Sequence, residues 1–217
     1  MFIIILKLHP KWKVLNQFLV NEMQTVMIKD GNPSVHAMTR DINTPKEISE
    51  IYDFVVYPKA ASVIRMIEHI MTPEAFRLSL NKYIRSKSLS AAKDEDLFEI
   101  LNDGMNEFTT LKHPHMYEIF RSWSNKPGFP VLTVVIQTSD QNAILKQSRF
   151  VSKIGLMEDT MFYIPTNYAF SSNPDFSTTT SSYYLINVTE IIQLPTMKAD
   201  EKWVIFNLQQ TGKITNY

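Results

Sequence analysis

The amino-acid sequence predicts a mixed α and β protein in two parts, with helices first and an antiparallel β-sandwich after them. Apolar residues recur at helical spacing over residues 10–128 and at every second position after that. The later segments are short, rich in Val, Ile, Thr, Tyr and Phe, and separated by Asp, Asn, Ser and Pro clusters, as in sandwiches. The change of period at Pro127-Gly128 divides the chain into residues 1–128 and 129–217.

The composition supports a folded chain and narrows its functions. The length of 217 residues is comfortable for two small domains. Hydrophobic residues make up 44% and aromatic residues 12%, which is enough to bury a core. Lys plus Arg and Asp plus Glu total 22 each, so no basic surplus favours nucleic-acid binding. The absence of Cys excludes disulfides, thiolate zinc sites and a Cys nucleophile.

The first residues, MFIIILKLHPKW, hold an apolar run of about six residues before Lys7. A membrane-spanning helix needs about 20 apolar residues, and a signal peptide needs a basic start and a small-residue cleavage site. We therefore expect a buried strand or helix end here, and no transmembrane span in this chain. A natural start upstream of Met1 stays open.

Helical spacing and start signals predict the elements of the first part in order. A first helix from about residue 10 carries Trp12, Leu15, Phe18, Leu19, Met23, Val26 and Met27. The stop at Asn43-Thr44-Pro45 precedes a short helix from Lys46 to Phe54. Pro58 is expected at the first position of the next helix, whose apolar stripe is Val63, Met66, Ile67 and Ile70.

Three more helices are expected before the strands. Thr72 is the expected N-cap of the first, Asp94 caps the second, and Pro114 opens the third. Their inward residues are Phe76, Leu80, Tyr83, Ile84, Leu97, Phe98, Ile100, Leu101, Tyr117, Phe120 and Trp123. The predicted strands are PVLTVVIQT, NAILKQSRFV, MFYIPTNYAF, SYYLINVTEI and KWVIFNLQ, with a polar loop at 171–182.

No self-contained catalytic motif is present. The chain has five His and no H-E-x-x-H, and His113-Pro114-His115 is best explained as two exposed histidines where a helix begins. His69 is expected to be a core or boundary histidine. The run from Gly212 to Thr215 lacks the preceding Gly of a phosphate loop and the Ser or Thr directly after the Lys. Asn187-Val188-Thr189 is a glycosylation sequon, which matters only if the chain enters the secretory path.

Several stretches, in order along the chain, resemble the aminopeptidase N family of zinc metallopeptidases, the gluzincin aminopeptidases. They are HPKWKVLNQFLVNEMQTVMIKDGNPSVHAM at 9–38, YPKAASVIRMIEH at 57–69, residues 76–97, WSNKPGFPVLTV at 123–134, and QSRF, IPTNY and WVIFN in the second part. The second resembles the family's Tyr-x-Lys-Gly-Ala run. The resemblance covers nearly the whole chain and implies the helical C-terminal part of a thermolysin-like catalytic domain, followed by a β-sandwich.

The resemblance implies a catalytic role for Tyr57, which stands where a helix-capping Ser, Thr or Asp is expected. In the family this Tyr donates a hydrogen bond to the substrate carbonyl oxygen as negative charge develops there, while zinc activates the attacking water. Packing is the other explanation, because an aromatic ring at a helix start often covers the core. Ala60 departs from the family pattern, which has Gly at this position.

The family's zinc ligands, catalytic Glu and amino-group-binding motif lie upstream of all the matching stretches. The resemblance therefore implies a fragment that holds no zinc of its own, is inactive as the isolated chain, and binds peptide only when the missing segment completes it. The alternative is a non-enzymatic interaction or decoy module derived from an aminopeptidase. The family's animal members imply an extracellular or cell-surface localisation.

Overall fold

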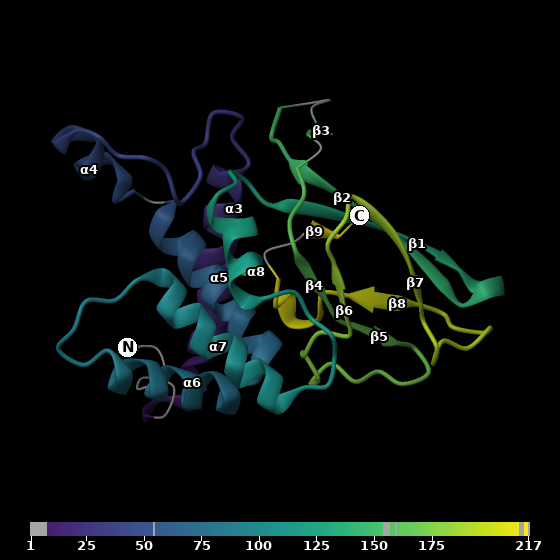
Figure 1. Cartoon of the computed structure of the whole chain (residues 1–217). Helices are drawn as coiled ribbons and strands as arrows, with labels where there is room; N and C mark the ends of the chain where they lie inside the picture. The colour runs from purple at the N-terminus through teal and green to yellow at the C-terminus, as the bar shows by residue number, and fades with distance from the viewer. Residues whose placement is uncertain (1–7, 54, 154–156, 159, 213–214, 217) are drawn as a thin grey trace.

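The structure is a computed structural model that describes residues 8–53, 55–153, 157–158, 160–212 and 215–216. Helices occupy the first part of the chain and strands the second, and Figure 1 shows the two groups side by side. The expected mixed α and β class is confirmed. The thermolysin-like arrangement, the two-layer sandwich and the division after residue 128 stay predictions. The expectation for the start of the chain falls on residues 1–7, outside the described residues.

The first helical segment consists of a short turn and a longer continuous helix. The 3-10 turn η1 (Pro10–Trp12) ends at Lys13, whose backbone is left-handed with φ 49°. The chain continues as α2 (Val14–Phe18), the π-helical stretch η2 (Leu19–Gln24) and α3 (Thr25–Asp30). Trp12 and Leu15, expected on the inward stripe, are exposed. The turn at Lys13 separates Trp12 from the helix, and Val14 takes the inward position instead of Leu15.

The remaining helices are α4 (Pro45–Ile51), α5 (Val56–Met71), α6 (Pro73–Ser86), α7 (Asp94–Phe108) and α8 (Met116–Ser124). The predicted start at Thr72 is confirmed by its cap, and the helix expected from Lys46 begins one residue earlier, after a Thr44 cap. The Thr44 hydroxyl accepts from the Glu47 amide at 3.3 Å, while the Glu47 carboxylate accepts from the Thr44 amide at 2.8 Å. The Thr72 hydroxyl accepts from the Ala75 amide at 3.4 Å. The helix expected to reach Phe54 ends at Ile51, and Phe54 lies outside the described residues.

Three helix starts differ from the prediction by a few residues. Pro58 is the third residue of α5, where it still needs no intrahelical partner for an N–H. Asp94 is the first residue of α7, and it is Asp96 whose carboxylate accepts from the Lys93 amide at 2.9 Å. Helix α8 begins two residues after Pro114, because His115 Nδ1 accepts from the Tyr117 amide at 3.3 Å and so caps the helix.

The apolar stripes are confirmed in α5 but only partly in α6. Val63, Met66, Ile67 and Ile70 are all buried. In α6 the buried residues are Ala75 and Ser79, whereas the expected Phe76, Leu80 and Tyr83 are half-buried and Ile84 is exposed. Small residues form the inner face of α6 because this helix lies close against α7 at Gly104.

The strands form one five-stranded sheet and two pairs. In the large sheet, β2 (Asn142–Phe150) pairs antiparallel with β1 (Pro130–Gln137), with β3 (Met157–Glu158) and with β7 (Thr189–Gln193). The short β9 (Thr215–Asn216) pairs parallel with β1, so the expectation of a purely antiparallel arrangement is wrong at this edge. The pairs are β4 (Ile164–Thr166) with β6 (Tyr183–Leu185), and β5 (Tyr168–Phe170) with β8 (Val204–Phe206). The predicted loop at 171–182 contains no strand.

One hydrophobic core joins the helices to the strands. It runs from Val63 and Ile67 on α5 through Trp123 on α8 to Phe162 and Leu185 among the strands. Trp123 is fully buried against Phe162, at 5.1 Å between ring centroids, and its Nε1 donates to the Tyr163 carbonyl at 3.0 Å. The helical layer is therefore fixed against the strands by packing as well as by the chain connection.

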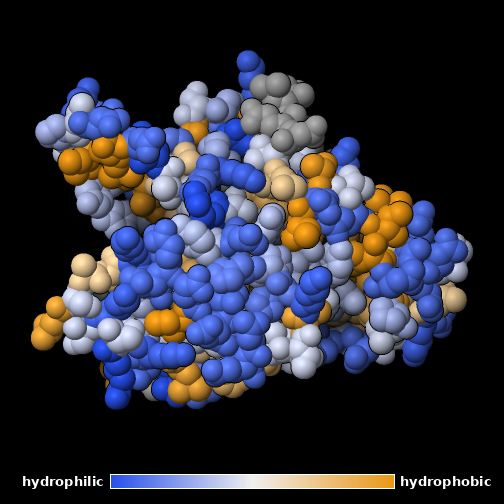
Figure 2. Space-filling model, in the orientation of Figure 1, coloured by the Kyte–Doolittle hydropathy of each residue, from blue (hydrophilic) through white to orange (hydrophobic). Residues whose placement is uncertain are grey.

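The visible surface is mostly polar with separate apolar areas (Figure 2). One lies over α4, where Ile48 is exposed, and another lies over β1 and β7, where Val135 and Ile191 are exposed. No helix within the described residues combines the length and the apolar character needed to cross a bilayer.

Candidate functional site

Tyr57 is the second residue of α5 and points its ring away from the core. Its exposed fraction is 62%, and its ring stacks on that of Tyr52 with 6.3 Å between centroids. Tyr52 is itself 65% exposed. The explanation of Tyr57 as an aromatic cover for the core therefore does not fit the structure. An accessible phenol can donate a hydrogen bond to a bound molecule.

The cap of α5 is Asp53, not Tyr57. One carboxylate oxygen, Oδ1, accepts from the backbone amides of Val55 and Val56, both at 2.9 Å. These amides belong to the first turn, where a helix has no carbonyl of its own to offer them. Asp53 was not among the residues predicted from the sequence. An Asp just before a helix start is the signal that could have identified it.

His36 holds the second oxygen of Asp53. Its Nε2 lies 2.9 Å from Asp53 Oδ2, and its Nδ1 lies 2.8 Å from the Ala37 carbonyl oxygen. Burial raises the pKa of the Asp53 carboxyl, but the hydrogen bonds from the Val56 amide and from His36 outweigh it, so the pKa lies below its usual value. Asp53 is thus held in the charged form that caps α5 best.

Lys59, two residues after Tyr57, makes a fully buried ion pair. Its Nζ lies 3.1 Å from Asp30 Oδ2 at the end of α3 and donates to the carbonyls of Lys126 and Gly128 at 3.0 and 2.8 Å. Burial lowers the pKa of Lys59, and the negative charge of Asp30 opposes this. Asp30 Oδ1 also accepts from the Gly128 amide at 2.9 Å. The start of α5 is therefore tied to α3 and to the segment that leads into β1.

The other histidines discussed above bond to residues other than Tyr57. His69 is half-buried near the end of α5, where its Nδ1 lies 2.8 Å from the Thr179 hydroxyl. Burial, assisted by the charge of Arg65, lowers its pKa to about 4. His115 caps α8 with Nδ1 and lies 3.4 Å from Glu99 through Nε2. His113 bonds to the adjacent Pro114 carbonyl.

The described residues do not fit a zinc site by themselves. Nowhere in residues 8–53, 55–153 and 160–212 do three His, Asp or Glu side chains come together as a set that could hold a metal ion. The pair His36–Asp53 supplies two groups, and both are already used in capping α5. We therefore assign no metal ligand among these described residues.

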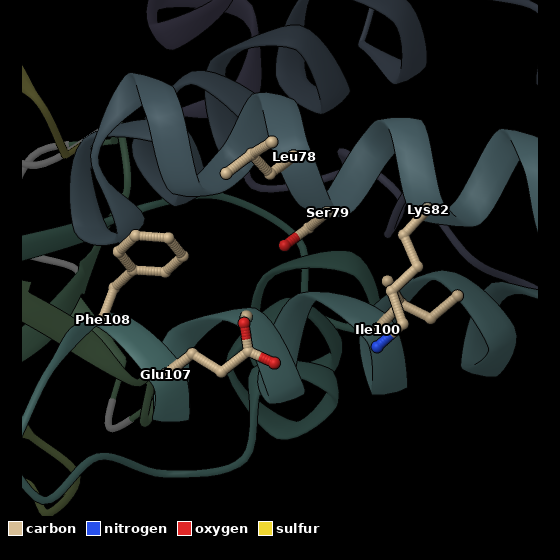
Figure 3. Close-up of a pocket in the computed structure, with 7 residues that line it drawn as sticks. Leu78, Ser79, Lys82, Ile100, Glu107 and Phe108 are labelled. Atoms are coloured by element: carbon tan, nitrogen blue, oxygen red, sulfur yellow. The ribbon is translucent and has the colours of Figure 1, made fainter.

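A small open pocket lies between α6 and α7 and is separate from Tyr57 (Figure 3). It is lined by Leu78, Ser79, Lys82, Ile100, Gly104, Glu107 and Phe108. Ser79 lies at its base, beside Gly104, where an added Cβ would come within 2.1 Å of the Ser79 hydroxyl oxygen. The pocket therefore marks the close approach of two helices, and we assign it no ligand.

The sequon residue Asn187 lies on the exposed turn between β6 and β7. Its side-chain amide donates to Glu190 Oε1 at 2.7 Å. The turn is attached to β2, because the buried Gln147 side chain donates to the Asn187 carbonyl at 2.8 Å.

Comparison with known proteins places these residues in context. The model of the peptidase family M1 domain matches residues 1–123. Aminopeptidase N of Plutella xylostella is 35% identical over 206 residues, which are 94% of this chain and 22% of that protein. Aminopeptidase M1 of Arabidopsis thaliana is 36% identical over 145 residues, 67% of this chain and 15% of that protein. Aminopeptidase N of Mus musculus is 27% identical over 217 residues. The chain thus spans about a fifth of the length of the curated relatives.

Proposed function

The chain belongs to peptidase family M1, and on this premise we propose that it supplies the Tyr57-bearing wall of an aminopeptidase active site. The enzyme would remove N-terminal residues from peptides, as the names of the relatives indicate for those proteins. The observation that carries the proposal is the exposed phenol of Tyr57 at the start of α5, within the part of the chain that matches the family.

The chemistry asked of Tyr57 is the stabilisation of one developing charge. Attack on the first peptide bond turns the carbonyl carbon tetrahedral and places negative charge on its oxygen. A phenol held beside that oxygen donates a hydrogen bond that is stronger in the transition state than in the bound substrate. Such a donor typically lowers the barrier by about 3–4 kcal/mol. Zinc dependence is general in this family, and the proposed role of Tyr57 is confined to the hydrogen bond that its phenol donates.

On the same premise, we also propose how the two parts of the chain correspond to domains. Residues 1–128 would correspond to the helical part of a thermolysin-like catalytic domain, and residues 129–217 to the β-sandwich that follows it. The isolated chain would be inactive, because its sequence contains no H-E-x-x-H and a donor has no charge to stabilise without an activated water. Peptide would bind only when a segment with the metal ligands completes the site.

The role of Tyr57 is tested in the full-length gene product that contains these residues, with Tyr57→Phe. We expect kcat to fall by about 10²–10³ with a small change in KM, because only the transition-state contact is lost. Tyr83→Phe on α6 is the matched control and should leave kcat unchanged. An unchanged kcat in Tyr57→Phe would falsify the assignment.

The inactivity of the isolated chain is tested separately. The purified 217-residue chain is analysed for bound zinc and for hydrolysis of an aminoacyl anilide. We expect neither. Stoichiometric zinc together with turnover that Tyr57→Phe abolishes would overturn this part of the proposal.

The interaction module is kept as a second candidate because of one observation. Leu15, Val20 and Ile28 on α2, η2 and α3 expose 51%, 56% and 77% of their surface, and such apolar side chains are typical of binding faces. The same exposure suits a wall that the rest of a catalytic domain covers. A genomic sequence with an in-frame H-E-x-x-H upstream of Met1 favours the peptidase, and its absence favours the interaction module.

A further inference from the structure

The start of α5 is held by two side chains that come from different segments. Asp53 lies in the turn before the helix and caps it, while His36 lies 17 residues earlier in the chain and binds the free oxygen of that carboxylate. His36 is half-buried and Asp53 is half-buried, with side-chain exposures of 27% and 33%. The pair therefore links the segment after α3 to the turn that presents Tyr57.

The capping contact is needed here because α5 has few other means of closing its first turn. The N–H groups of Val55 and Val56 have no helical carbonyl to bond to, and Pro58 has no backbone N–H. The first regular bond of the helix runs from the Lys59 amide to the Val55 carbonyl at 3.0 Å. Without Asp53 the turn that contains Tyr57 would therefore fray, as helix ends commonly do.

His36 is well placed to keep Asp53 in this position. Its two ring nitrogens face two fixed oxygens, those of the Ala37 carbonyl and the Asp53 carboxylate. The segment that carries it is anchored as well. Met38 is buried, and the Thr39 amide donates to the Ser124 carbonyl at the end of α8 at 2.9 Å. His36 therefore reaches Asp53 from a fixed support.

Core packing does not orient the Tyr57 ring, since 62% of its surface is exposed. Its direction depends on the backbone of the first turn and on the stack with Tyr52, the residue just before Asp53. A donor that acts on a developing charge must be held to within a fraction of an ångström. The groups that fix this turn are therefore the groups that fix the donor.

We propose that His36 and Asp53 form a positioning pair that fixes the first turn of α5 and so aims the Tyr57 hydroxyl at the substrate oxygen. This inference rests on the proposed function of Tyr57. Neither residue touches the reacting atoms in this scheme. Their effect on the reaction passes through the backbone of residues 55–57.

The structural half is tested on the 217-residue chain by NMR measurement of amide hydrogen exchange at Val55 and Val56. Asp53→Ala should raise exchange at both amides on the order of fivefold, the usual effect of removing a cap. His36→Gln should raise it less, and should add nothing in the Asp53→Ala background, because it acts only through Asp53. Thr44→Ala, which removes the cap of α4, is the matched control and should leave both amides unchanged. Unchanged exchange in Asp53→Ala overturns the proposal.

The catalytic half is tested by a double-mutant cycle in the full-length gene product. Asp53→Ala should lower kcat more than tenfold with little change in KM, and in the Tyr57→Phe background it should lower kcat no further. A purely structural role predicts effects that multiply, and that result overturns the positioning role. If Tyr57→Phe alone leaves kcat unchanged, the proposed function fails, and the catalytic role of the positioning pair fails with it. The hydrogen-exchange result still reports whether His36 and Asp53 fix the first turn of α5.

Discussion

At the scale of single residues, close contact between two helices explains why position 104 holds a Gly, which the sequence pattern does not explain. Gly104 on α7 has an ordinary helical backbone, so it is not needed for its conformational freedom. Its importance is steric, because a Cβ there would lie 2.1 Å from Ser79 Oγ on α6. Ser79 is buried, with 4% exposed.

The first prediction concerns this contact. Gly104→Ala should lower the free energy of unfolding by about 1–3 kcal/mol, the usual cost of overpacking, measured by urea denaturation. Ser79→Ala with Gly104→Ala should recover most of that loss, because the remaining neighbours, Ser79 Cβ and Met71 Cε, lie at 3.4 Å. Equal destabilisation in the single and double variants would contradict the steric explanation.

At the scale of elements, α5 is the helix on which the other parts of the molecule converge. Its start carries Tyr57 and the Asp53 cap, and its middle packs on α6, α7 and α8. Its last turns face the second part of the chain, where Arg65 donates to the carbonyls of Gln209 and Gln210 and His69 contacts Thr179. A titration at this end of α5 therefore reports on its contact with the 171–182 loop.

The second prediction is a pH dependence of stability that arises from His69. Its pKa is about 4 in the folded chain and about 6.5 in an unfolded one, so between these values the unfolded chain binds the extra proton. The stabilisation is complete above about pH 6.5 and is lost as pH falls toward 4. Relative to His69→Gln, the wild-type free energy of unfolding should decline across this window. His9→Gln, an exposed histidine stacked on Trp12, serves as control, and a constant difference for His69→Gln would refute the prediction.

At the scale of the whole molecule, a buried ion pair holds the helical part to the strands. Asp30 ends α3, Lys59 belongs to α5, and both bind the Gly128 backbone just before β1. Gly128 also has a left-handed backbone, φ +78°, and lies against the Arg149 side chain of β2. Two helices and the start of the sheet therefore meet at one fully buried charge pair.

The third prediction is that Lys59→Met costs about 3–5 kcal/mol of unfolding free energy, because it removes the buried cation that faces the Asp30 carboxylate. The pair of changes Asp30→Asn and Lys59→Met should cost less, since the buried anion is then neutralised together with the loss of its buried cation. Lys82→Met is the control, because the Lys82–Asp103 pair is exposed and loosely spaced at 3.8 Å. Urea denaturation measures all three variants, and a loss under about 1 kcal/mol for Lys59→Met would contradict the role assigned to the pair.

Periodicity in the sequence predicted the elements well and their ends less well. The inward stripe of α5 and the strands β1 and β2 follow directly from the spacing of apolar residues. The starts of α5, α7 and α8 were misplaced by one or two residues. Each start is decided by the side chain that accepts a hydrogen bond from a free backbone N–H. These side chains are Asp53, Asp96 and His115. Whether a side chain can make such a bond depends on the folded backbone, and the spacing of apolar residues carries no information about it.

The sequence by itself determined the change from helices to strands and, through its ordered motifs, the family to which the chain belongs. It also pointed to Tyr57 as the candidate donor. Only the tertiary structure decided that the Tyr57 ring is exposed, that His36 holds the cap of its helix, and that Asp30 and Lys59 meet in the core. Local patterns report which face of an element is apolar. They carry no information about which distant charged groups packing will bring within hydrogen-bonding distance of each other, and those contacts position the candidate site.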